Sequence, residues 1–212
     1  MHKEILELKH QVLEMATLAS NMLKDSIKAL LNQDLELAKQ VDKQKHQLRN
    51  YDDSIEERTL KLLTLYQPMA KDMRRIATIL KVITYLTRIG RYGKDIANVT
   101  LELENLGNPK RLINLQHMQE HVDVMISRAI EAFNKSDVSF VEDFSERDDE
   151  VDQLRWSIFR ECITYMMESA ACITPCAHYI MVARYLERCG DHACKIAEKV
   201  HYMVTGERIE IK

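Results

Sequence analysis

Proline and glycine are scarce in this chain. Three prolines and five glycines occur among 212 residues, and such low use excludes turn-rich or disordered low-complexity architectures. Both residue types interrupt helices, so their scarcity predicts long uninterrupted helices. No apolar run approaches the roughly 18 residues that a membrane-spanning helix needs, and no apolar stretch of the kind found in secretory signal peptides follows Met1. We therefore expect a cytoplasmic protein.

A strong charge of one sign is also missing. The formal net charge is -3 at pH 7, which gives no electrostatic support for nucleic-acid binding. Hydrophobic residues make up 46% of the chain, enough for a packed core. The cysteines number five, and an odd number in a chain without a secretion signal favours reduced thiols. No nucleophile–base pairing, P-loop or dinucleotide fingerprint occurs, so we expect no enzyme activity.

Apolar residues at helical spacing predict six helices. They cover about 2–32, 34–66, 69–106 and 112–134, then a fifth helix opened by Asp137 and a sixth from Pro175 to near Gly206. The clearest break is the Gly-Asn-Pro run at 107–109. Short connections imply antiparallel neighbours. The predicted fold class is all-α, with two antiparallel three-helix bundles, 1–106 and 107–212, that pack together.

The two halves repeat one pattern. Segment 86–97 recurs as segment 186–197, with Leu, Arg, Gly, Ile and Ala in the same places. An offset of about 103 likewise matches the apolar residues of the first two helices to those of the fourth and fifth. The exceptions are Glu187 and Asp191, which face a threonine and an arginine in the first copy. The repeat indicates a duplicated architecture in which only one half has this carboxylate pair, and the pair is therefore a candidate functional site. The alternative is that the duplication serves only as a structural scaffold.

Two acid pairs in the second half have four-residue spacing. Glu187 and Asp191 lie one turn apart on one helical face, and Asp148 and Asp152 do so on the fifth helix. A helical wheel places the first pair opposite the core stripe, on an expected outer face. Antiparallel neighbours bring the two pairs together, and their oxygens suit Mg, Mn, Ca or Fe. The alternative is a solvated acidic face that nearby arginines and lysines neutralise.

The matching places of the first half are cationic. The repeat puts Lys45 and Arg49 where Asp148 and Asp152 lie, and it puts Arg91 at the place of the last acid. Because cations repel a metal ion, we expect no metal cluster in the first half. Two interpretations remain for these side chains: a site for an anion such as phosphate or an acidic partner segment, or local ion pairs along each helix.

The cysteines have two predicted roles, as core residues or as part of the acidic site. Cysteine on a helix is usually a small core residue, and Cys189 fits this interpretation because it takes the place of Ile89. Cys194 instead shares the helical face of the acids. A thiol there adds either a metal ligand or redox sensitivity.

These motifs resemble those of the PhoU family. Residues 186–193 are similar to the family's acid-x-x-x-Asp signature that ends in Gly-Asp, and residues 147–154 are similar to its other half. Residues 67–75 are similar to the family's turn into its third helix. Further segments that fit are 164–168, 180–186 and 204–207. The resemblance covers nearly the whole chain and both repeats.

The resemblance implies six helices in two bundles, a homodimer, and a negative regulator of phosphate uptake. Such a protein would be a cytoplasmic adaptor between the ATPase of the phosphate ABC transporter and a sensor histidine kinase, reaching the membrane only through partners. Some members bind multinuclear iron or zinc clusters through the acid motifs, which assigns ligand roles to Asp148, Asp152, Glu187 and Asp191. The alternative function is a metal-binding or redox-sensing bundle unrelated to phosphate.

Overall fold

The computed structural model describes residues 2–104 and 113–211. Within these residues the chain forms α-helices and two 3-10 turns, with no strand, and the predicted all-α fold class is confirmed. The elements are α1 (His2–Asn32), α2 (Leu35–Tyr66), α3 (Ala70–Glu102), α4 (Ile113–Lys135), η1 (Val138–Val141), α5 (Phe144–Glu168), η2 (Ala170–Cys172) and α6 (Ile173–Thr205).

The helix starts follow local capping chemistry. Asp34 begins α2, because its carboxylate accepts a hydrogen bond from the Leu37 amide at 3.0 Å. Asp137 accepts the Ser139 amide at 2.9 Å in the same way, but it opens the short turn η1. The prediction that Asp137 begins the fifth helix is therefore wrong, since α5 starts at Phe144.

Two other predicted helix limits need correction. The third helix ends at Glu102, before the predicted position 106, and the Leu103 amide still bonds to the carbonyl of Val99. The sixth begins two residues before Pro175, whose missing N–H costs nothing in the first turn of a helix. The predicted stop at 107–109 and the boundary between the halves lie outside the described residues.

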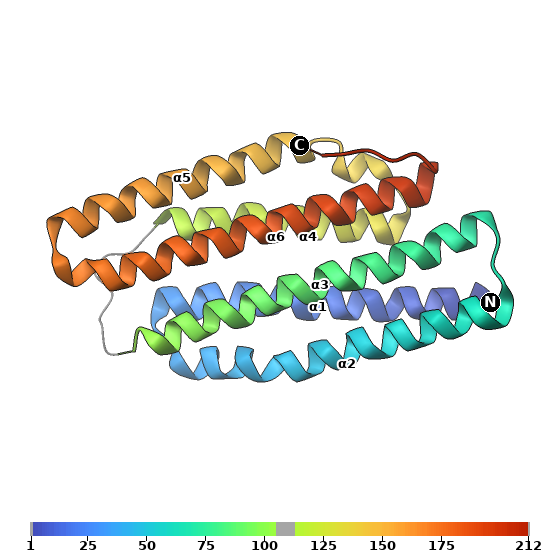
Figure 1. Ribbon diagram of the computed structural model, residues 1–212, viewed down its shortest axis with the longest axis horizontal. Helices are drawn as coiled ribbons and strands as arrows, with labels where there is room; N and C mark the ends of the chain where they lie inside the picture. The colour runs from blue at the N-terminus through green and yellow to red at the C-terminus, as the bar shows by residue number, and fades with distance from the viewer. Residues whose placement is uncertain (1, 105–112, 212) are drawn as a thin grey trace.

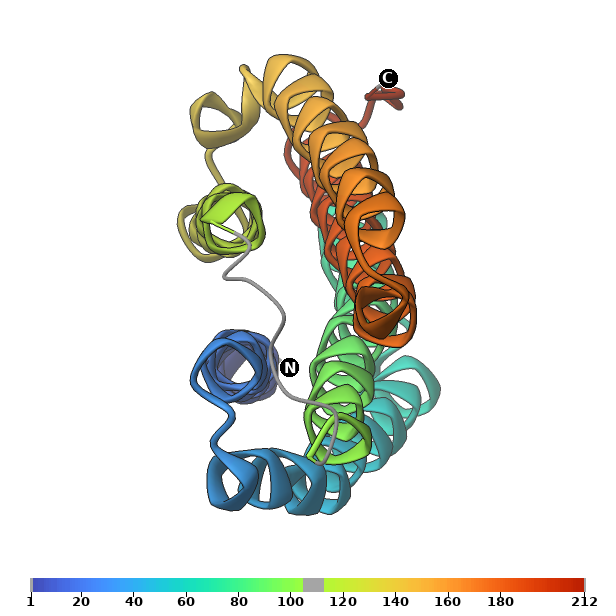
Figure 2. The ribbon, with the colours of Figure 1, turned by 90° about the vertical axis from the view of Figure 1, so that its left-hand side faces the viewer.

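The six helices lie along one axis of the molecule (Figure 1). α1 and α4 lie side by side, and α3 and α6 lie side by side opposite them, so these four helices enclose the centre (Figure 2). α2 and α5 flank the α3–α6 pair at its two edges. The α2–α3 turn and the α5–α6 turn are at opposite ends of the molecule.

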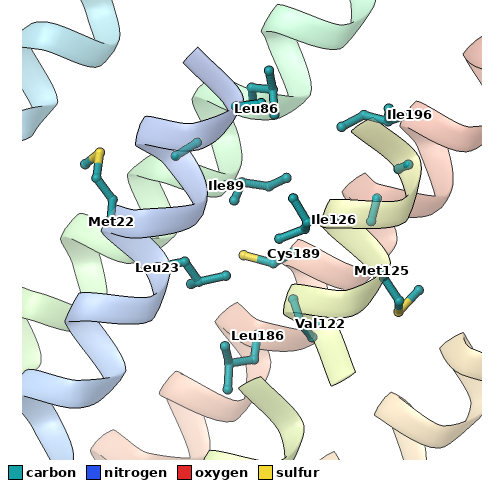
Figure 3. Packing of buried hydrophobic residues seen from close by; sticks show 14 of the residues in the cluster. Met22, Leu23, Leu86, Ile89, Val122, Met125, Ile126, Leu186, Cys189 and Ile196 are labelled. Carbon is teal, nitrogen blue, oxygen red and sulfur yellow. The ribbon is translucent and has the colours of Figure 1, made fainter. Parts of the chain in front are cut away.

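Matched residues of the two halves fill one continuous core. Figure 3 shows Ile89 and Cys189 from α3 and α6 pointing into the same space as Leu23 and Ile126 from α1 and α4. All four are at most 1% exposed. Cys189 is thus a core residue, as its match to Ile89 predicts.

Four stacked rings mark where α3 meets α6. Tyr92 stacks on Tyr185 at 5.4 Å and on His192 at 6.0 Å, and His192 stacks on Tyr85 at 5.7 Å. Tyr85 and Tyr185 hold matched positions, as do Tyr92 and His192, so the repeats meet here in a twofold arrangement. Burial, with help from Arg88, lowers the pKa of His192 to about 4, which keeps this ring neutral near pH 7.

Candidate functional site

The acids of the second half meet between α5 and α6. Cys194 Sγ donates to Asp148 Oδ1 at 3.6 Å, which joins the two helices. Burial raises the pKa of Asp148, and the Asp191 carboxylate raises it further. Burial also raises the pKa of the Cys194 thiol, with Asp148 as the next cause. Asp148, Asp191 and Cys194 therefore form one polar cluster, which we call the α5–α6 acid cluster.

Glu187 has a different set of neighbours. Its carboxylate pairs with Arg155 from α5 at 3.2 Å and with Arg184 one turn earlier on α6. The Arg155 guanidinium also lies over the Trp156 ring, 4.3 Å from its centre. A nearly buried carboxylate needs such partners, because an unpaired charge there is costly. Glu187 thus neutralises a cation that crosses between two helices.

The prediction that the acid-bearing face of α6 is an outer face is wrong. Glu187 is 9% exposed, Cys194 is 3% exposed, and the Glu198 side chain is buried as well. The reason is that α6 contacts α3, α4 and α5. A helical wheel identifies the most apolar face of a helix, but it does not show how many neighbouring helices cover the other faces.

The remaining predicted ligands do not point at a common centre. Asp152 is exposed, and Asp191 pairs with Arg188 at 3.1 Å. In the described parts of the chain, no three His, Cys, Asp or Glu side chains are grouped as metal ligands would be. With Glu187 and Asp191 both held by arginines, these residues fit a metal only after those ion pairs open.

The three predicted cations of the first half differ in their surroundings. Lys45 bonds to Asp42 at 2.9 Å, and Arg49 lies 3.7 Å from Asp53. Each of these two therefore has an acid on its own helix. Arg91 instead lines a groove of about 750 Å³ along α3 beside α2.

Sequence reasoning missed Arg155 and its first-half counterpart. Arg155 holds the most buried of the predicted acids, and the offset of 103 that matched Lys45 with Asp148 also matches Asp52 with Arg155. This reversal of charge at a matched position was visible in the sequence. Asp52 and Arg91 both line the α2–α3 groove.

The five cysteines are free thiols. Cys162 and Cys176 lie against each other where α5 and α6 approach the hairpin turn, and both are fully buried. Burial raises the pKa of Cys162 to about 12. Since the thiolate is the reactive form, this environment makes Cys162 a poor nucleophile.

Known proteins share both the sequence and the fold. The PhoU domain model matches residues 12–100 and again residues 115–200. A phosphate-specific transport system accessory protein PhoU homolog of Rhizobium meliloti is 36% identical over 96% of this chain and 86% of its own length. A homolog of the same name in Caulobacter vibrioides is 34% identical over 98% of this chain and 90% of its own.

Two crystal structures superpose on nearly the whole chain. PhoU from Pseudomonas aeruginosa has a TM-score of 0.92 and 32% identity, covering 97% of this chain and 99% of its own. The PhoU of Streptococcus pneumoniae, at 24% identity and a TM-score of 0.88, has the same fold over 99% of both chains. In the described part of this chain, no helix has the length and apolarity of a membrane span. By sequence and by fold, this chain belongs to the PhoU family.

Proposed function

We propose that this chain is a negative regulator of phosphate uptake and phosphate signalling. It would act without catalysis, as a cytoplasmic adaptor on the ATPase of the phosphate ABC transporter and on a sensor histidine kinase. The observation that carries this proposal is the match of both halves to the PhoU domain, together with full-length relatives named as accessory proteins of phosphate transport. A homodimer is the assembly that we expect.

Apolar side chains at the two hairpin ends support a role in protein contacts. Met69 at the α2–α3 turn is 82% exposed, and Met167 at the α5–α6 turn is 83% exposed. Leu65 and Ile173 are exposed beside them. Grouped apolar residues on a surface are typical of binding sites, and methionine adapts to varied partners. Because the two turns lie at opposite ends (Figure 1), one molecule has room for two partners.

The test is a deletion of the gene in its own organism, with phosphate uptake measured in excess phosphate. Uptake should rise severalfold in the deletion and return to normal with the intact gene. Purified transporter ATPase should bind the purified chain, and sedimentation should report a dimer. Unchanged uptake, with no binding to the ATPase, would refute the adaptor role.

A second proposal is a metal site at the α5–α6 acid cluster, holding iron or zinc. Its support is that Asp148, Asp191 and Cys194 lie near one another, with Asp152 and Glu187 as further candidate ligands. Binding would require the ion pairs of Glu187 and Asp191 with arginines to open. Metal content by plasma mass spectrometry tests it, with wild type compared to Glu187→Ala/Asp191→Ala. The matched control removes two exposed acids of equal spacing, Asp53→Ala/Glu57→Ala. Metal lost only in the first variant supports the site, and metal-free wild type that binds none on titration refutes it.

The redox-sensing alternative has weaker support. It would use Cys194, whose thiol contacts Asp148, but burial raises the pKa of that thiol and so lowers its thiolate fraction. After hydrogen peroxide treatment of the folded protein, mass spectrometry should find Cys194 unmodified. Fast, selective oxidation at this cysteine would favour the alternative.

A further inference from the structure

The two repeats differ in what fills the space between their second and third helices. In the second repeat, Arg155 of α5 and Glu187 of α6 meet as a nearly buried ion pair. The matched residues of the first repeat are Asp52 of α2 and Thr87 of α3. The match is structural as well, because Gly90 faces Leu48 and Gly190 faces Val151, at the same two offsets. Two long side chains are thus replaced by two short ones.

The shorter pair coincides with a hollow. The groove of about 750 Å³ beside α3 is lined by both Asp52 and Thr87. Asp52 and Glu56 form its wall on α2, and three exposed cations of α3, Lys81, Arg88 and Arg91, lie along its other wall. This α2–α3 groove occupies the place that the Arg155–Glu187 pair occupies in the second repeat.

Asp52 and Glu56 on one wall, and Arg88 and Arg91 on the other, have no ion-pair partner among the residues that the structure describes. The neighbouring acids Asp53 and Glu57 pair with Arg49 and Lys61, whereas Asp52 and Glu56 form no ion pair with any residue that the structure describes. Arg88 and Arg91 likewise have no ion pair within the described ranges. The wall acids and wall cations therefore face a space that they do not close.

Asp52 is the most constrained of these groups. It is half-buried beside the Thr87 hydroxyl. Burial raises the pKa of its carboxyl, the Thr87 hydroxyl lowers it, and the nearby Glu56 and Asp53 carboxylates raise it again. A carboxylate that has acidic neighbours and no ion pair among the described residues is stabilised in its charged form by a cation that comes within contact distance.

We propose that the α2–α3 groove binds an arginine-bearing segment of a protein partner, with the guanidinium seated between Asp52 and Glu56. The second repeat carries within its own chain the arginine that the first repeat takes from its partner. Guanidinium fits better than ammonium, because it donates two parallel hydrogen bonds to carboxylates. An acidic side chain of the same segment meets Arg88 and Arg91. This inference rests on the adaptor role proposed above.

The first experiment uses a small probe and no partner protein. The ¹⁵N-labelled full chain is titrated separately with Nα-acetyl-arginine amide, with Nα-acetyl-lysine amide and with inorganic phosphate. The arginine probe should shift the amide signals of Asp52, Glu56 and Thr87 more than the lysine probe does. Phosphate binding at Arg88 and Arg91 with no effect of arginine would identify an anion site and overturn the proposal, as would the absence of any shift.

The second experiment measures affinity for purified transporter ATPase. Asp52→Asn/Glu56→Gln keeps the shape of the groove and removes its two charges, and binding should weaken at least tenfold. The control, Asp53→Asn/Glu57→Gln, removes equal charge from adjacent positions of the same helix and should stay within twofold of wild type. Equal binding by both variants would overturn the groove as the docking site while leaving the adaptor role intact.

A third variant closes the groove. Asp52→Arg/Thr87→Glu installs the ion pair that the second repeat already accommodates, so the variant is expected to fold. In this variant the arginine probe should no longer shift the amide signals of the groove, and the affinity for the ATPase should fall at least tenfold. If wild type binds the arginine probe at Asp52 but does not bind the ATPase, the arginine site in the groove is supported and the adaptor role on the ATPase is refuted. Probe binding that survives in this variant would contradict the assignment.

Discussion

In the first repeat α3 approaches α1 through Gly93, whereas the second repeat has Ala193 at the matched position of α6. A Cβ atom added at Gly93 would lie 2.8 Å from the backbone nitrogen of Leu23 and 2.8 Å from the backbone carbon of Met22. Ala193 carries its methyl group fully buried. The α1–α3 pair is therefore in backbone contact where its counterpart has room for a side chain. Duplication has preserved the arrangement of the helices, but each repeat tolerates substitutions differently.

The largest predicted effect breaks this close approach. Gly93→Ala should destabilise the protein by about 3 kcal/mol, because helix backbones cannot yield as a flexible side chain does. Urea unfolding followed by circular dichroism measures the free energy of unfolding. Gly90→Ala is the informative comparison, since the three atoms nearest to the added methyl there all belong to the side chain of Leu48. A loss at Gly93 no larger than that at Gly90 would contradict the backbone contact.

The second prediction concerns the ion pair that only the second repeat has. Glu187→Gln should cost about 2 kcal/mol of unfolding free energy, because it leaves the largely buried Arg155 without a carboxylate partner. Asp191→Asn is the control, since its partner Arg188 is well exposed and such pairs contribute about 0–1 kcal/mol. Equal losses in the two variants would show that burial does not set the strength of the Glu187 pair.

Periodicity predicted much of the fold. The six helices, the all-α class and the matched core positions such as Leu86 and Leu186 follow from apolar spacing, and burial confirms them. The start of α5 was missed because an aspartate cap opens a 3-10 turn as readily as a helix. The apolar residues that follow Asp137 are compatible with both a 3-10 turn and an α-helix.

The candidate site was predicted less well, for a physical reason. Spacing alone placed Glu187 and Asp191 on one face, and they do share it. The spacing of residues within one helix does not reveal that Arg155 reaches Glu187 from another helix, since ion pairs between helices depend on tertiary packing. The same limit concealed the α2–α3 groove, which lies where the first repeat has shorter residues, Asp52 and Thr87, than the second.

The third prediction separates the two matched glycines. Gly190→Ala should stabilise the protein by up to about 1 kcal/mol, because alanine favours a helix interior and the added methyl meets Val151 at 3.6 Å, an ordinary contact distance. At Gly90 the same methyl would lie 2.4 Å from a Leu48 methyl group, so Gly90→Ala should destabilise. The sequence repeat places these two glycines at matched positions, and opposite signs in urea unfolding would show that close packing requires a glycine only in the first repeat.

The smallest predicted effect depends on pH and lies in the α2–α3 groove. The pKa of Asp52 is raised in the folded protein, mainly by burial, so the folded state binds this proton more tightly than the unfolded state does. Its contribution to stability is present below the ordinary pKa of aspartate and is lost as the pH rises through the folded value. Asp52→Asn removes the buried charge and should stabilise the protein at pH 7 by less than about 1 kcal/mol, with the gain vanishing near pH 3.5.

Urea unfolding at several pH values measures this difference, and Asp53→Asn is the control in the same helix. Asp53 is exposed and lies 3.7 Å from Arg49, so its removal should give no gain at pH 7. A destabilised Asp52→Asn variant at pH 7 would mean that a cation already compensates this carboxylate in the free protein. The groove would then have no unpaired acid to offer an arginine, and the contrast with the Arg155–Glu187 pair would disappear.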